Sequence, residues 1–244
     1  NSALSPRSLK RTVVLIVTFS LLLMALAWTV VIEQAQFERS EAITAAIRQN
    51  KNRAIAFEQY VTRTLEAANV ATLHLSDKHA SIGGTAANPR WIDDPVVNND
   101  LFDVVSIANE KGDIVATTWK PPPVNMNSAD RIGFYIHRPK DSRRLYIGEP
   151  KKVYTVGGKM LMTLSRRITE PDGSFGGVVA IQMDPDKFTD FYSDAAVRPT
   201  DVISVIGLDG ITRARRTGNK ASSGENLRGL PVMAFQAQYP NGTY

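Results

Sequence analysis

Few of the residues that enzymes use for chemistry occur in this chain at a spacing that could form a catalytic or metal site. The 244 residues include no Cys, so disulfides and thiolate metal sites are excluded. The three His residues lack metal-ligand spacing, and no Ser stands in a G-x-S-x-G motif. Asp184 and Asp186 flank Pro185, which is typical of a helix start and not of a metal pair. The sequence therefore predicts a segment without catalytic activity, cofactor or metal.

The adjacent residues Arg166 and Arg167 end an apolar strand pattern and are candidates for a charged site. Arg166 could contact an anionic ligand, but such arginines more often occupy a solvated or carboxylate-paired surface position. Asp130 is expected to cap the N-terminus of a helix. Nearby glycines are typical of turns and strands, because no helix follows them in a phosphate-binding pattern: Gly158, Gly173, Gly176 and Gly177.

The two arginines belong to a long hairpin that is predicted over residues 157–188. Side chains alternate over residues 160–168 as in a strand, and Pro171-Asp172-Gly173 is a turn sequence. A second apolar run, residues 178–183, is predicted to return beside the first strand. Asp184 then begins a short helix. This helix is expected to carry three aromatic residues: Phe188, Phe191 and Tyr192.

The N-terminal part of the chain has the pattern of a membrane-spanning helix. Residues 12–32 carry no charge and are long enough to cross about 30 Å of hydrocarbon. Arg7, Lys10 and Arg11 precede this run and Glu33 follows it, which places the N-terminus in the cytoplasm and the remainder outside. A cleaved signal peptide is the alternative, but the run is longer than usual and lacks a small-residue cleavage site.

The charge of the chain does not indicate a nucleic-acid partner. There are 29 Lys and Arg against 24 Asp and Glu, for a formal charge of +5, and three of the positive residues precede the apolar run. The remainder of the chain is thus nearly neutral, and the high pI reflects membrane topology.

A long amphipathic helix is predicted over residues 34–75, which contain neither Pro nor Gly. Its stripe could pack on the sheet of its own domain or on the same helix of a second subunit. The residues of the stripe are Ile43, Ile47, Ala54, Phe57, Val61, Leu65, Ala68 and Leu75.

Short apolar runs between this helix and the hairpin predict further strands of the same sheet. They lie at four places: residues 101–107, 114–118, 145–148 and 152–156. Pro121-Pro122-Pro123 between the second and third of these predicts an extended crossing of a sheet face.

Residues 105–117 and 203–215 share a plan of apolar strand, acid-Gly turn and second strand. This repetition predicts a second, related α/β unit from about residue 198, with the chain ending partway through it, in a helix or crossing at residues 230–244. The alternative is a final hairpin that completes the first sheet.

Several short motifs occur together behind the apolar N-terminal run. They are Ser128-Ala129-Asp130-Arg131, Phe134-Tyr135-Ile136-His137, Leu145-Tyr146-Ile147-Gly148-Glu149-Pro150, Leu164-Ser165-Arg166-Arg167-Ile168 and Asp172-Gly173-Ser174-Phe175. In this order the chain from about residue 34 to residue 216 resembles the double Cache (PDC, PAS-like) extracellular sensors of bacterial transmembrane signalling proteins. The LSRRI strand and DGSF turn resemble most those of GGDEF diguanylate cyclases, and less often those of histidine kinases or chemoreceptors.

The resemblance implies a ligand site. In amino-acid-binding members an Arg of the crossing helix takes the ligand carboxylate, aromatic residues form a cage and an Asp on the last long strand takes the ammonium. Arg131 matches that Arg, whereas Gly133, Phe134 and Gln182 stand where Trp, Tyr and Asp are usual. Because the ammonium would lose its charged partner, a small organic anion is the expected ligand. The implied ligand residues are Arg131, Phe134, Tyr135, His137, Tyr146, Arg166 and Gln182; for His137 a role in stabilising the fold is the alternative.

The sequence thus predicts an α+β protein with a cytoplasmic N-terminus (1–11), a transmembrane helix (12–32), a long helix with a membrane-distal Cache unit (33–197) and the start of a membrane-proximal Cache unit (198–244). It is expected to be a periplasmic sensor in the bacterial inner membrane, to form a homodimer and to pass a ligand signal to a cytoplasmic output domain, a diguanylate cyclase. The alternatives are the sensor of a histidine kinase or chemoreceptor, and a structural module without a ligand.

Overall fold

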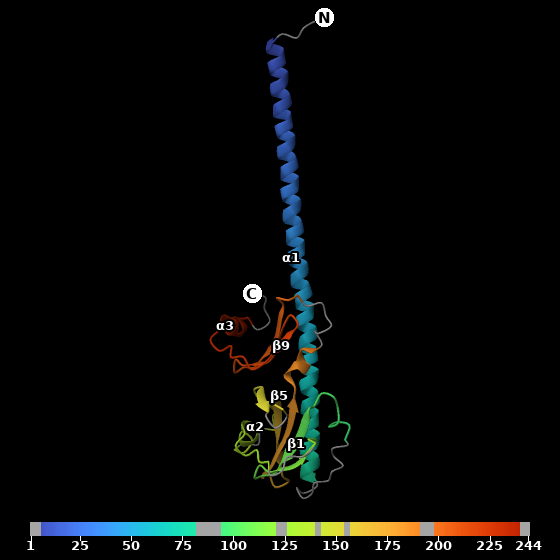
Figure 1. Cartoon of the computed structure of the whole chain (residues 1–244), viewed down its shortest axis with the longest axis vertical. Coiled ribbons are helices and arrows are strands. Elements are labelled where there is room, and N and C mark those ends of the chain that lie inside the picture. The colour runs from blue at the N-terminus through green and yellow to red at the C-terminus, as the bar shows by residue number, and fades with distance from the viewer. Residues whose placement is uncertain are drawn as a thin grey trace. The chain divides into compact units, whose positions relative to one another are not determined.

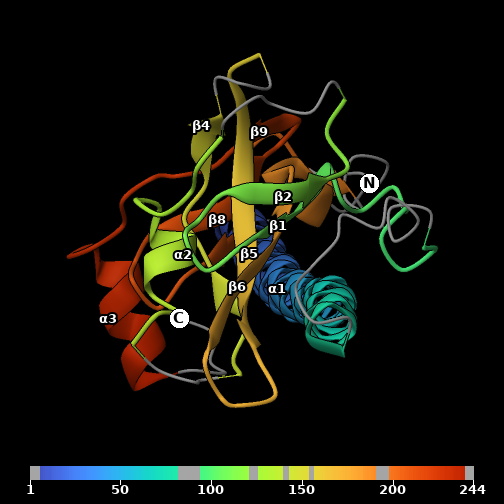
Figure 2. The ribbon, with the colours of Figure 1, turned by 90° about the horizontal axis from the view of Figure 1, so that it is seen from below.

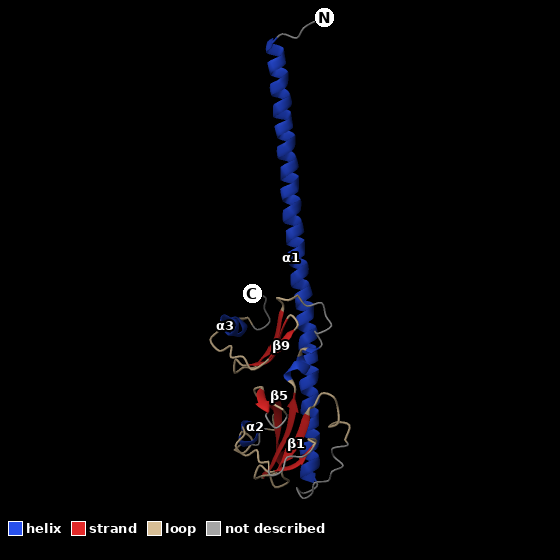
Figure 3. Cartoon of the chain, in the orientation of Figure 1, coloured by secondary structure: helices blue, strands red, loops and turns tan. Residues whose placement is uncertain are grey.

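The computed structural model describes residues 6–81, 94–120, 126–139, 143–153, 157–190 and 198–239. The chain divides into two compact units, Asn1–Gln59 and Tyr60–Tyr244. Figure 1 labels several of the elements, which are numbered in chain order, and Figure 3 distinguishes the helices from the strands. Several predictions concern positions outside the described residues: the prolines at 121–123, residues 154–156 of one predicted strand, and Phe191 and Tyr192.

A single helix, α1 (Pro6–Ser81), contains both the apolar N-terminal run and the long helix predicted over residues 34–75. It continues without a break because no Pro or Gly follows Pro6 before its end. By length and composition, it is the one helix of the described residues that could cross a membrane. Within the unit Asn1–Gln59 most of its side chains are exposed, including Ile43 and Ile47 of the predicted stripe.

The unit Tyr60–Tyr244 contains a six-stranded antiparallel sheet in the order β2-β1-β6-β5-β3, with β4 also paired to β5. The strands are β1 (Val104–Ala108), β2 (Ile114–Thr117), β3 (Tyr146–Ile147), β4 (Lys151–Val153), β5 (Lys159–Thr169) and β6 (Phe175–Met183). The hairpin predicted over residues 157–188 is confirmed as β5 and β6, with Gly173 at a φ of 85° in its turn. The predicted α+β fold is confirmed.

The sheet packs α1 against one face and the short helix α2 (Ile132–Tyr135) against the other (Figure 2). On the α1 side, Ala68 and Leu75 join a core with Leu164 and Ile181. On the α2 side, the buried ring of Phe134 contacts a smaller cluster that includes Ala108 and Val178. Because side chains alternate along a strand, successive residues of β5, and likewise of β6, point to opposite faces of the sheet. The sheet therefore has a helix-covered core face and a second face available for a site.

The last described strands form a sheet of their own. They are β7 (Val202–Ile206), β8 (Thr212–Thr217) and β9 (Lys220–Ser222), in the order β7-β8-β9, followed by α3 (Pro231–Gln238). The alternative of a final hairpin that completes the first sheet is therefore wrong. Between the sheets lies the 3-10 helix η3 (Pro185–Phe188), whose predicted cap is confirmed, because Asp184 Oδ1 accepts a hydrogen bond from Asp186 N at 3.0 Å.

Two predictions about charged residues are wrong. Asp130 does not cap α2, because Arg131 occupies the cap position and makes no capping hydrogen bond through its side chain. Arg166 and Arg167 are not surface residues, because they are only 5% and 8% exposed. Burial of both guanidinium groups requires hydrogen-bond partners inside the fold, which the structure supplies from backbone carbonyls and neutral side chains.

Candidate ligand-binding site

A cavity of about 470 Å³ lies between α2 and the sheet face opposite α1. Its floor comes from alternate positions of three strands, including Ala108 of β1, Leu161 and Thr163 of β5, and Ala180 of β6. The small side chains of Ala108 and Ala180 leave room above the sheet. The volume falls within the range of small-molecule sites, about 300–1,000 Å³.

The first wall of the cavity is α2 and the residues before it. The carbonyl of Arg131 accepts hydrogen bonds from the backbone N–H groups of Phe134 (2.8 Å) and Tyr135 (3.0 Å), which sets the single turn. Phe134 is 2% exposed and meets Phe175 edge to face with ring centroids 5.4 Å apart. Phe134 thus anchors the turn, while Arg131 and Tyr135 line the cavity with exposed side chains.

Close packing of α2 on the sheet depends on Gly133. A Cβ at this position would lie 3.3 Å from Ser165 Oγ and 3.5 Å from Thr163 Cγ2. Gly133 therefore allows the crossing to lie directly on β5, and it contributes no aromatic side chain to the wall.

The second wall comes from β3, β4 and the turn between them. Tyr146 pairs with Ser165 of β5, and Gly148 N donates to Thr163 O at 2.8 Å. Tyr146 and Glu149 both line the cavity. Burial raises the pKa of the Tyr146 hydroxyl, and the Glu149 carboxylate raises it further, so this phenol stays protonated at neutral pH.

Gln182 marks the end of the cavity floor on β6. It stands opposite Thr163 on β5 and Val104 on β1. Its Oε1 is buried without a hydrogen-bond partner among the described residues. A buried amide oxygen without a hydrogen-bond partner costs free energy. A bound molecule that reorients the Gln182 amide would therefore change the free energy of this part of the fold.

His137 lies beneath the cavity wall and is not among the residues that line it. Its side chain is buried, with Nε2 3.1 Å from Ser165 Oγ and its ring edge to face with Tyr146 at 6.4 Å. Burial lowers the pKa of His137 to about 4, although the Ser165 hydrogen bond opposes this, and the Arg166 and Arg167 charges lower it further. A neutral imidazole at neutral pH supports the wall and is poorly suited to hold an anion.

Arg166 lies on the opposite face of the sheet. Its Nε donates to Thr72 Oγ1 of α1 at 3.2 Å, and its terminal nitrogens donate to Asn69 Oδ1 and to the carbonyl of Arg143. Strand alternation turns Arg167 to the cavity side, where it donates to the carbonyl of His137 at 2.9 Å. The structure therefore does not bring Arg166 to the cavity.

The structure brings five of the seven predicted ligand residues together around the cavity: Arg131, Phe134, Tyr135, Tyr146 and Gln182. Asp130, which the sequence assigned to a helix cap, also lines the cavity. Sequence reasoning missed four further charged or aromatic lining residues: Trp119, Glu149, Lys151 and Lys152. Glu149, Lys151 and Lys152 follow the short strand β3. Their concentration of charge beside Gly148 and Pro150 was the feature of the sequence that could have indicated a site here. The cavity thus contains carboxylates even though β6 supplies none.

The fold is that of extracellular sensor domains of signalling receptors. The extracellular domain of the histidine kinase rpHK1S-Z16 is similar with a TM-score of 0.66 and 22% identity, over 75% of each chain. The ligand-binding domain of the Campylobacter jejuni chemoreceptor Tlp3 in complex with L-valine is similar with a TM-score of 0.53 and 11% identity, over 80% of this chain and 79% of that one. No protein-family model and no curated protein matches the chain.

Proposed function

We propose that this chain is the ligand-sensing region of a membrane-bound bacterial signalling receptor that binds a small organic carboxylate. The observation that carries the proposal is the cavity of about 470 Å³ over the sheet, which Arg131 lines together with aromatic side chains. Apolar floor residues and a few convergent polar groups are the usual composition of a small-molecule site. The likeness to extracellular sensor domains supports this function.

The charges around the cavity support a carboxylate with a second polar group. Arg131, Lys151 and Lys152 provide positive charge, and Asp130 and Glu149 provide negative charge. A guanidinium binds a carboxylate through two parallel hydrogen bonds. The convergent polar groups count against a purely structural module, which would leave them without a role.

The chain is proposed to be anchored in the inner membrane by the apolar part of α1, with the sensor in the periplasm. The absence of charge over residues 12–32 and the basic residues before it support this topology.

We also propose a homodimer, because the exposed apolar residues Ile43 and Ile47 on α1 suit a second copy of the same helix. Residues 33–197 and 198–244 are proposed to form two successive Cache units, in line with the separate sheet of β7, β8 and β9.

The output domain is proposed to be a cytoplasmic diguanylate cyclase, on the strength of the LSRRI strand and the DGSF turn. A histidine kinase is the second candidate, because the similar extracellular domain with the TM-score of 0.66 is named as that of a histidine kinase. In both cases the cavity has the same role and the enzymatic activity lies outside this segment.

A thermal-shift screen of the full chain in detergent tests the proposal. Carboxylates, amino acids, amines and nucleobases are added separately, because a ligand that binds the native state raises Tm by mass action. We expect stabilisation by at least one carboxylate and its loss in the Arg131→Ala variant. No stabilisation by any class, with a well-folded protein, would count against ligand sensing through this cavity.

A further inference from the structure

The 3-10 helix η3 follows directly on the strand that ends the cavity floor. Two residues separate Gln182, which lines the cavity, from Pro185, which opens η3. Met183 between them is fully buried, and Asp184 caps η3. Because Pro185 fixes its own φ and Asp184 closes the first turn, this connection is short and stiff. Displacement of the end of β6 must therefore move η3.

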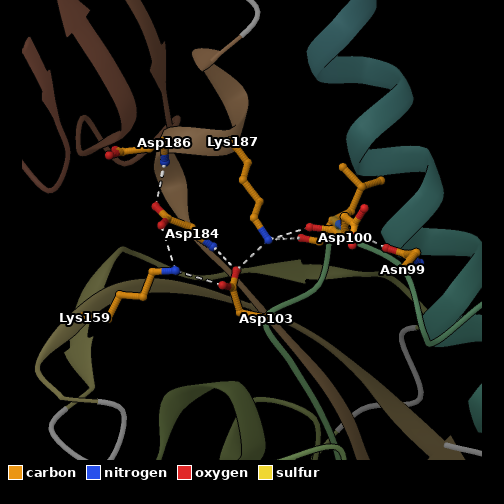
Figure 4. Close-up of polar contacts among 8 residues, drawn as sticks. Asn99, Asp100, Asp103, Lys159, Asp184, Asp186 and Lys187 are labelled. Atoms are coloured by element: carbon orange, nitrogen blue, oxygen red, sulfur yellow. Dashed lines mark hydrogen bonds and ion pairs between the residues drawn. The ribbon is translucent and has the colours of Figure 1, made fainter.

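Asp103 holds the end of β6 and η3 together (Figure 4). Its backbone N–H donates to the carbonyl of Gln182 at 2.9 Å, and its carboxylate accepts from Asp184 N at 2.8 Å. The same carboxylate contacts Lys159 at 2.9 Å and Lys187 at 3.0 Å. Burial alone would raise the pKa of Asp103, but these hydrogen bonds outweigh it and lower the pKa. The ionised carboxylate thus joins the cavity strand to η3.

One contact of η3 is with α1. The Tyr60 hydroxyl donates to the carbonyl of Lys187 at 2.8 Å. The Lys187 side chain extends from the same turn to the carbonyls of Asp100 (2.7 Å) and Leu101 (3.2 Å). Figure 4 shows Lys187 pointing from η3 toward the segment before β1. The Tyr60 hydroxyl on α1 is thus hydrogen-bonded directly to η3. Because a hydrogen bond weakens steeply as its length and angle change, a small shift of η3 would weaken this contact.

The second contact of η3 is with the sheet of β7, β8 and β9. Arg216 on β8 is 8% exposed and donates through Nε to the carbonyl of Thr189 at 3.2 Å. Its Nη2 lies 3.0 Å from Asp190 Oδ1. Thr189 is tied back to η3, because its hydroxyl donates to the carbonyl of Asp186 at 3.1 Å. The guanidinium and its hydrogen bond to the Thr189 carbonyl are buried, whereas the Asp190 side chain is 57% exposed, so the bond to Thr189 is the more firmly held part of this contact.

We propose that η3 couples the cavity to two separate parts of the molecule, to α1 through Tyr60 and to the second sheet through Arg216. The coupling rests on the proposed function, because a bound ligand is what would displace Gln182. Displacement of Gln182 moves η3 and changes the contacts with Tyr60 and with Arg216 together. A change in the cavity can therefore reach both α1 and the second sheet.

The coupling can be tested without a ligand. In the full chain in detergent, Ala180→Trp fills the floor of the cavity, and Ala180→Leu is the milder variant if the first does not fold. Hydrogen exchange measured by mass spectrometry should change at residues 57–64 of α1 and at residues 212–217 of β8, by at least twofold in rate. Exchange that changes only at residues lining the cavity overturns the proposal.

Separate removal of the two contacts sharpens the test. Tyr60→Phe should abolish the change at residues 57–64 and leave the change at residues 212–217. Arg216→Lys should have the converse effect, with Asp190→Asn as a second variant at the same contact and Arg215→Lys as the matched control. Changes that persist at both segments in these variants overturn the route through η3.

The outcomes separate this coupling from the proposed function. A chain that transmits the Ala180→Trp change but binds none of the screened compounds supports the coupling and removes the ligand-sensing function. A chain that binds a carboxylate but confines the Ala180→Trp change to the cavity keeps the function and overturns the coupling.

Discussion

Arg167 is the residue that ties the α2 segment to the hairpin. Its guanidinium donates to the carbonyls of His137 (2.9 Å), Arg138 (3.3 Å) and Gly173 (3.3 Å) and lies 4.9 Å from the centre of the Phe175 ring. A lysine has a single nitrogen and cannot make this set of contacts. The wall of the cavity therefore depends on a planar, buried cation.

We expect Arg167→Lys to destabilise the folded protein by about 1–3 kcal/mol, because buried carbonyls would lose their donors. Chemical denaturation of the full chain in detergent measures this loss. The exposed Arg144 is the control, and Arg144→Lys should leave the midpoint unchanged. Equal midpoints for the two variants would contradict the role assigned to Arg167.

Gly177 requires the absence of a side chain. It has a φ of +126°, and a Cβ would overlap the backbone oxygen of Ala108 on the neighbouring strand. We expect Gly177→Ala to cost about 3 kcal/mol or more, because both the backbone and β1 would have to shift. Gly157 is the control, since it has a φ of +68° with nothing within 4 Å of the Cβ position. Gly157→Ala should cost only about 1 kcal/mol in unfolding experiments; a similar cost for both would contradict the steric argument.

At the residue scale, the sequence was a good guide to residues whose role is local and a poor guide to those whose role depends on partners distant in the chain. Asp184 was correctly predicted to cap a helix, because capping involves only its neighbours. The burial of Arg166 could not be predicted, since its partner Thr72 is 94 residues away.

At the scale of elements, α2 and β5 are joined by a buried neutral histidine. His137 has a pKa lowered to about 4, against 6.5 for an ordinary His. Between these values the unfolded chain binds a proton that the folded chain excludes, so stability is full above pH 6.5 and falls as the pH drops toward 4. The loss amounts to about 1.4 kcal/mol per pH unit, or about 3 kcal/mol in all.

His137→Gln should remove this part of the pH dependence, because the amide can hydrogen-bond to Ser165 but does not titrate. Melting temperatures of the full chain from pH 7 to pH 4 give the comparison. We expect the wild type to lose more stability than the variant over this window. Parallel curves for the two proteins would show that His137 is not the titrating group.

The elements themselves were largely predictable because their signals are local. Residues 157–188 contain a turn sequence between two alternating runs, and they fold as β5, β6 and η3. The order of the strands could not be predicted in this way, because β6 pairs with β1 across about 75 residues of chain and no local pattern specifies that partner. The cavity arises from this pairing, which places Ala108 beside Val178. Its lining could therefore be predicted only in part.

At the scale of the whole molecule, the apolar part of α1 is expected to cross the membrane with the basic N-terminus inside. The chain contains no Cys, so single cysteines report topology cleanly. Ser40→Cys should react with a membrane-impermeant maleimide in intact spheroplasts, and Ser5→Cys should react only after lysis. Labelling of Ser5→Cys in intact spheroplasts would reverse the proposed orientation.

Binding of a carboxylate in the cavity is the central claim, and isothermal titration of the best hit from the thermal screen tests it most directly. The titration compares the wild-type chain with Arg131→Ala and with Arg144→Ala, a matched loss of an exposed arginine outside the cavity. Loss of a charge-assisted hydrogen bond is worth about 1.4 kcal/mol or more, which corresponds to about tenfold in Kd. We expect at least tenfold weaker binding to Arg131→Ala and unchanged binding to Arg144→Ala. Equal affinity of all three proteins would contradict the assignment of this cavity as the sensor site.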